Sequence, residues 1–97
     1  MRETLNRLAA MRQILLGMEV GLGIDSLGEP EALVLYAAAQ SQKECKEISI
    51  TAMQAHPLTQ KIPRSTFFRA IGTLIERGLL VKAGPEKRSG YLLCMKD

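Results

Sequence analysis

The chain has 97 residues, of which 46% are apolar and 24% are charged, and its formal net charge is +3. This length fits one globular domain that buries roughly 60–65% of the surface its unfolded chain exposes, so a second subunit would add useful stability. The longest apolar run, at 32–39, is far shorter than the ~20 residues of a membrane span. The N-terminus mixes arginines into its apolar positions, unlike a secretory signal. We therefore expect a cytoplasmic protein with no membrane partner.

The sequence carries no signature of an enzyme. Its two cysteines, Cys45 and Cys94, form no CxxC pair and have no histidine cluster beside them, so we expect reduced thiols and no metal site. A glycine-rich nucleotide loop and a nucleophile next to a histidine motif are also missing. The single histidine, His56, is expected to be structural. We therefore expect neither catalysis nor a cofactor.

The charge is unevenly distributed along the chain. Residues 1–42 carry three basic and five acidic side chains, a balance of −2, whereas residues 43–97 carry ten basic and five acidic ones, a balance of +5. Positive side chains concentrate at 61–88. Such a concentration favours a polyanionic partner.

Residues 2–22 are predicted to form a helix, which with the following loop makes up a first unit, 1–27. Its apolar residues recur at alternating steps of three and four, the spacing of the seam between two packed helices: Leu8, Met11, Leu15, Met18 and Leu22. One interpretation is a homodimer formed through this seam. The others are a helix that covers the protein's own core and a seam that binds a different protein.

Three further helices and a hairpin are predicted in the second unit, 28–97. Pro30 suits the first turn of a helix that runs to about residue 42, with Leu33, Tyr36, Ala37 and Gln40 along one side and Val34 and Ala38 beside them. After Ile48, which could form a very short strand, Ser49 is a good N-cap for a short helix at about 50–56 that Pro57 should stop.

The fourth predicted helix, 63–77, begins at Pro63 and ends before Gly78. Steps of three and four place five apolar residues on its inner side: Phe67, Ala70, Ile71, Leu74 and Ile75. The opposite side carries groups suited to phosphates and base edges: Arg64, Ser65, Phe68, Arg69, Thr73 and Arg77.

Short apolar runs at 79–83 and 90–95 enclose a basic, glycine-bounded loop, GPEKRSG, at 84–90. This pattern is typical of two antiparallel strands joined by a loop. The predicted fold class is therefore mainly α with a small β-hairpin.

Helix, turn, helix and basic hairpin, in this order, resemble the DNA-binding core of MarR-like winged helix-turn-helix transcriptional regulators. The resemblance covers about half of the chain and rests on RSTFFRAIGTLIERGLL at 64–80 and KRSGYLL at 87–93. It implies a winged helix with helix 63–77 in the major groove of double-stranded DNA and wing 84–90 on the backbone or in the minor groove. The turn before the fourth helix is longer than in that family, and Pro63 stands where a capping serine is common. The family's long C-terminal dimerisation helices have no counterpart here, and the N-terminal helix would take their role.

The expected contacts divide into two kinds. Arg64 or Arg69 would bind guanine O6 and N7, while Ser65 or Thr66 would bond a base or a phosphate. Phosphate neutralisation by the basic residues would make binding salt-dependent. The full set of predicted DNA-binding residues is Lys61, Arg64, Ser65, Thr66, Phe68, Arg69, Thr73, Lys87 and Arg88.

Two other functions remain open from the sequence. A winged-helix module that binds protein would need an apolar or acidic outward side on 63–77, which the arginines oppose. A replication or plasmid-maintenance protein would also bind DNA, and the sequence alone does not distinguish it from a regulator. The sequence does not identify a small-molecule effector.

Overall fold

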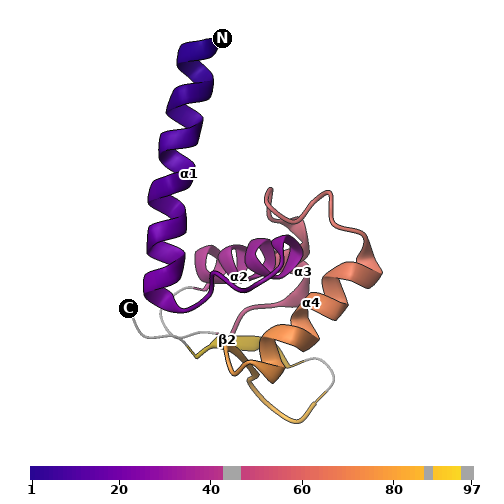
Figure 1. Ribbon diagram of the computed structural model, residues 1–97. Helices are drawn as coiled ribbons and strands as arrows, with labels where there is room; N and C mark the ends of the chain where they lie inside the picture. The colour runs from indigo at the N-terminus through magenta and orange to yellow at the C-terminus, as the bar shows by residue number, and fades with distance from the viewer. Residues whose placement is uncertain (43–46, 87–88, 95–97) are drawn as a thin grey trace.

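The computed structural model describes residues 1–42, 47–86 and 89–94. In this part of the chain, four helices are followed by two strands: α1 (Arg2–Leu22), α2 (Glu29–Ser41), α3 (Ile50–Ala55), α4 (Arg64–Glu76), β1 (Leu80–Lys82) and β2 (Tyr91–Leu93). The later helices and the strands form a globular body from which α1 projects (Figure 1). The prediction of a mainly helical chain with a small antiparallel hairpin is confirmed.

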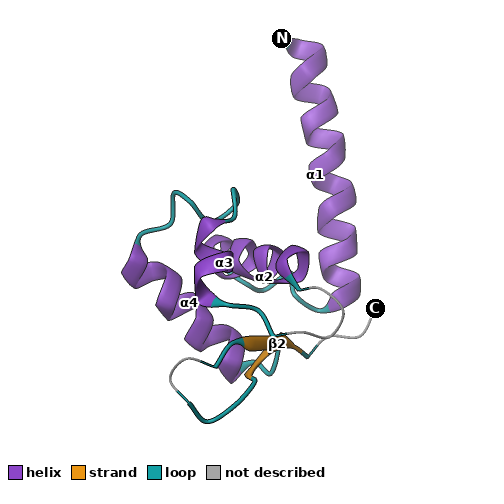
Figure 2. Cartoon of the chain, turned by 180° about the vertical axis from the view of Figure 1, so that it is seen from behind, coloured by secondary structure: helices purple, strands orange, loops and turns teal. Residues whose placement is uncertain are grey.

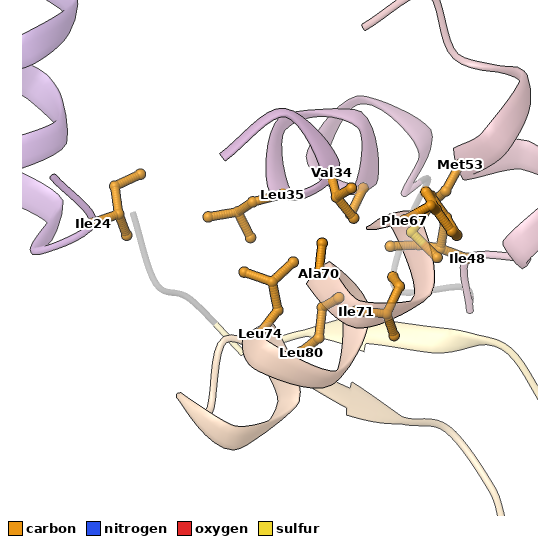
Figure 3. Close-up of a cluster of buried hydrophobic side chains, with 11 residues drawn as sticks. Ile24, Val34, Leu35, Ile48, Met53, Phe67, Ala70, Ile71, Leu74 and Leu80 are labelled. Carbon is orange, nitrogen blue, oxygen red and sulfur yellow. The ribbon is translucent and has the colours of Figure 1, made fainter. Parts of the chain in front are cut away.

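The core lies between α2 and α4, and the strands close it from one side (Figure 3). α2 buries Val34, Leu35, Ala37 and Ala38, and α4 buries Phe67, Ala70, Ile71 and Leu74. Ile24, Ile48, Met53 and Leu80 join them from neighbouring segments. The small alanines on both helices allow their backbones to approach closely.

Two details of the predicted core are wrong. Ile75 is 40% exposed, because the buried side of α4 centres on Ala70 and Leu74 and Ile75 lies at its margin. On α2, Gln40 is exposed, whereas Val34 and Ala38 are fully buried. The buried side of α2 is therefore centred on Val34 and Ala38 rather than on the side that runs through Gln40.

The predicted helix ends are confirmed to within one residue, since α4 covers Arg64–Glu76 where 63–77 was predicted. Ser49 Oγ accepts a hydrogen bond of 3.0 Å from the Ala52 amide, which caps α3. Gly78 has a φ of 75°, a left-handed conformation that L residues with side chains rarely adopt. Pro63 is the residue before the first turn of α4.

The hairpin pairs Leu80 with Leu93 and Lys82 with Tyr91 in antiparallel register. Ile48, just before α3, forms a bridge to Tyr91 through two backbone hydrogen bonds of 2.7 and 2.8 Å. A side chain at Gly90 would place its Cβ 2.6 Å from the Ile48 carbonyl oxygen, so this contact requires glycine. The bridge confirms the very short strand expected at Ile48, and it fixes the hairpin against the start of α3.

α1 does not cover the core, so that interpretation of residues 2–22 is wrong. All of α1 lies within the described residues, and none of its side chains is buried. Ile24, which follows α1, anchors it in the core, and the Tyr36 hydroxyl donates a hydrogen bond to the Glu19 carboxylate. Figure 2 shows α1 standing away from the body at nearly its full length. In the described part of the chain, no helix has the length and apolar character that crossing a membrane requires.

Candidate nucleic-acid interface

The outward side of α4 is open to solvent. Arg64, Ser65, Phe68, Arg69 and Gly72 are all exposed, on the side opposite the buried stripe. The helix is 13 residues long, or about 20 Å. It therefore presents a continuous cationic and polar strip that no described part of the chain covers.

Phe68 organises the beginning of this strip. Its ring meets the buried Phe67 ring edge to face, with centroids 5.3 Å apart and planes at 88°. The Arg64 guanidinium carbon lies 5.5 Å from the centroid of Phe68, within the range of a cation–π contact. Phe68 is 40% exposed, as expected for an outward residue, and it links Arg64 to the core.

The N-terminus of α4 offers a second feature suited to anions. The first amides of any helix lack intrahelical acceptors, and Pro63 at the N-cap makes no side-chain hydrogen bond to them. These amides and the positive end of the helix dipole favour a phosphate. Arg64 and Ser65, in this first turn, are exposed and can bind the same group.

Two of the predicted contact residues lie at the margin of the strip. Thr66 and Thr73 are half-buried, and the Thr73 hydroxyl donates to the Arg69 carbonyl at 3.2 Å. Arg77 donates from Nη2 to Ser26 Oγ at 2.9 Å, which ties the end of α4 to the loop after α1. Thr73 and Arg77 are thus engaged within the protein, whereas Arg64, Ser65 and Arg69 are directed outward.

The turn between α3 and α4 presents the exposed Lys61 and is held by two polar side chains. The buried Thr59 hydroxyl bonds to the Met53 carbonyl and, at 3.1 Å, to the His56 carbonyl. His56 Nδ1 accepts from the Leu58 amide at 3.1 Å, and its Nε2 is 2.6 Å from Gln40 Oε1. His56 is therefore structural, as expected, and the turn is fixed by internal bonds.

The hairpin loop lies at the end of the molecule away from the tip of α1 and close to α4 in the view of Figure 1. The predicted contacts Lys87 and Arg88 lie outside the described residues. Lys82, at the end of β1, is exposed and adds a positive charge at the base of the hairpin.

Gly72 was missed by the sequence reasoning. It is exposed in the middle of the outward strip, and no heavy atom lies within 4 Å of the position that a Cβ would occupy. A glycine inside a helix costs about 0.5–1 kcal/mol relative to alanine. That cost is the signal in the sequence that could have drawn attention to Gly72.

Among the described residues, no group of three or more His, Cys, Asp and Glu side chains is placed to hold a metal ion. Cys94 is a free, exposed thiol, and Cys45 lies outside the described residues. Comparisons with known protein families, curated proteins and solved structures gave no match.

Proposed function

We propose that this protein is a winged helix-turn-helix transcriptional regulator that binds double-stranded DNA with α4 in the major groove. The observation that carries the proposal is the uncovered strip on α4, in which Arg64, Ser65 and Arg69 face solvent beside one another. The protein acts as a dimer through α1, and its two α4 helices contact two half-sites.

The order of elements supports this assignment. A short helix, a fixed turn and a longer helix precede an antiparallel hairpin, and the bridge from Ile48 to Tyr91 ties the hairpin to the start of α3. This order is that of a winged helix, in which the second helix of the pair reads the major groove. α4 is the element that takes that place here.

The chemistry of the strip matches the two kinds of DNA contact. A guanidinium binds guanine O6 and N7 with two hydrogen bonds, which Arg64 and Arg69 can provide, and Ser65 can bond a base or a phosphate. Phe68, beside them, is apolar and suits a thymine methyl group. Lys61, in the turn before α4, and Lys82, at the end of β1, are exposed and serve phosphates without regard to sequence.

The composition of the strip also argues against a winged helix that binds another protein. Such a module would place an apolar or acidic surface on α4. Glu76 is the acidic residue of the helix, and it lies at the end opposite Arg64. Polyanion binding therefore suits this side better.

The test is selection of bound sequences from a random duplex pool at stated salt, followed by binding titrations of variants. Arg64→Ala and Arg69→Ala should each weaken binding to the selected duplex by about 1–3 kcal/mol and weaken binding to a scrambled duplex much less. Lys61→Ala should weaken both equally and lower the salt slope by about one. Gln13→Ala, a neutral change on the exposed side of α1 away from the seam, is the control and should leave both affinities unchanged. Equal losses on both duplexes for all of the α4 variants would contradict the assignment.

A further inference from the structure

α1 exposes many large apolar side chains to solvent, which is unfavourable for a helix without a partner. The seam residues Leu8, Met11, Leu15, Met18 and Leu22 are between 38% and 64% exposed, and Leu5, Ile14, Leu16 and Val20 are similarly open. Resting on the dimer proposed above, we infer that a second copy of the chain covers this seam and that its α1 runs antiparallel to the first.

The shape of the molecule leaves room for that second helix. A recess of about 700 Å³ lies between α1 and α2, lined on the α1 side by Arg12, Leu15 and Glu19 and on the other side by residues that include Leu33 and Tyr36. Beyond this recess the exposed seam continues along α1 past Leu8 and Met11. The seam thus borders a hollow that extends over the junction with the body.

The charges beside the seam decide the direction of the partner. With the seam residues at the a and d positions of a heptad repeat, Arg12 and Glu19 both lie on one flank, one heptad apart, and Arg7 lies on the other. In a parallel pair opposite flanks meet, which would bring Arg7 against Arg12 of the partner subunit. In an antiparallel pair like flanks meet, which brings Arg12 against Glu19 of the partner subunit, twice by symmetry.

The wider charge distribution favours the same direction. Residues 2–12 carry three arginines and one glutamate, a balance of +2, whereas residues 19–31 carry four carboxylates, a balance of −4. An antiparallel pair sets the positive end of each helix beside the negative end of the other. A parallel pair would stack like charges at both ends.

The register follows from the symmetry of the seam. Centring the pair on Leu15 places Leu8 opposite Leu22 of the partner subunit and brings Met11 to within one residue of Met18 of the partner subunit. Because the rise is 1.5 Å per residue, the two points where α1 enters the body are then about 21 Å apart along the helix axis. The N-terminal turn of each α1 extends toward the recess at the other copy's α2.

Glu19 is held ready for this contact. The Tyr36 hydroxyl donates to one oxygen of its carboxylate, which fixes the side chain at the edge of the recess. An ionised carboxylate accepts about four hydrogen bonds, so it can bind Arg12 of the partner subunit at the same time.

Charge reversal tests the direction in the absence of DNA, so that failure of the dimer and failure of DNA binding can be told apart. By sedimentation equilibrium, Arg12→Glu should raise the dimer dissociation constant by about tenfold or more, because at each of the two symmetric contacts it sets a glutamate against Glu19 of the partner subunit. Glu19→Arg should do the same, and a mixture of the two variants should form a 1:1 heterodimer with both pairs restored. Gln13→Glu, which adds a negative charge on the side away from the seam, is the matched control and should leave the dimer unchanged.

Three outcomes would overturn the inference. A tighter Arg12→Glu homodimer would show the parallel arrangement, in which the new glutamate meets Arg7. A monomeric wild-type chain would leave the seam without a second copy. Disulfides in a Cys45→Ser, Cys94→Ser background provide the last check: Met11→Cys should link to Met18→Cys in a mixed sample, and links between like positions instead would contradict the antiparallel register.

Discussion

At the scale of single residues, aromatic packing holds the beginning of the outward strip of α4 in place. Phe68 rests edge-on against Phe67 and carries the Arg64 guanidinium over its face. The position of a surface arginine is thereby tied to the core. Helical spacing alone predicted that Arg64, Phe68 and Arg69 point outward. The stacking of Arg64 on Phe68 could not be predicted in this way, because side-chain rotamers depend on neighbours in space.

Gly72→Ala separates folding from binding at this surface. The new methyl group meets no atom of the described chain, so we expect the free energy of unfolding to rise by about 0.5–1 kcal/mol. The same methyl group stands in the middle of the strip and should weaken binding to the selected duplex. Urea unfolding and fluorescence anisotropy measure the two effects. A variant that binds DNA as tightly as the wild type would show that nothing approaches the backbone there.

Tyr36 gives the link between α1 and α2 a pH dependence. Burial, the hydrogen bond to Glu19 and the negative charge of that carboxylate raise the pKa of Tyr36 to about 12. A tyrosine in the unfolded chain loses its proton near pH 10. The contribution of this hydroxyl to stability is therefore complete below about pH 10 and is lost as the pH rises toward 12.

Tyr36→Phe should accordingly flatten the fall in stability between about pH 10 and 12 and should leave its other pH dependence unchanged. Urea midpoints measured at intervals across this range compare the two proteins directly. Parallel curves for variant and wild type would contradict the assigned role of Tyr36.

At the scale of elements, local signals located the helices well. Ser49 caps α3 and Gly78 ends α4 through bonds and angles that involve near neighbours in sequence, which is why both were predictable. The role of α1 could not be predicted, because an apolar seam has the same spacing whether it covers the protein's own core or another helix. The turn before α4 was predicted, but the hydrogen bonds by which Thr59 holds it were not, since these bonds to the α3 and His56 carbonyls depend on how the chain folds back.

Thr59→Val tests how much the hydrogen bonds of Thr59 in this turn stabilise the fold. Valine keeps the shape of the buried side chain but leaves the carbonyls of Met53 and His56 without the hydroxyl donor, so we expect a loss of about 1–3 kcal/mol in the free energy of unfolding. Thr59→Ser retains the hydroxyl and should lose less. The comparison is made by thermal or urea unfolding, and equal stabilities of the valine and serine variants would exclude the hydrogen bonds as the reason for threonine here.

At the scale of the whole molecule, the two halves of the chain differ in charge and in shape. The globular body carries the positive balance and the α4 strip, while α1 projects from it and gives the molecule extents of 50 × 26 × 24 Å. Pairing of α1 would join two such bodies and bring two α4 helices onto one duplex, with half-sites about 34 Å apart. Affinity for such a site would then depend on a helix that does not contact DNA.

Leu15→Glu should dissociate the dimer, because a charge at the centre of the seam would have to be buried without a partner. We expect this variant to lose much of its affinity for a duplex with two half-sites and little of its affinity for a duplex with one. Light scattering reports the oligomeric state, and binding titrations on the two duplexes report the coupling. An unchanged preference for the double site would separate DNA binding from α1.

The most direct measurement is a map of backbone amide shifts of the nitrogen-15-labelled protein during titration with the selected duplex. We expect the largest changes at Lys61 and along Arg64–Thr73, with smaller ones around the hairpin and none at the free N-terminal turn of α1 beyond those that dimerisation explains. Changes confined to other surfaces, with the amides of α4 unmoved at saturating duplex, would contradict the assignment of α4 as the DNA-binding element.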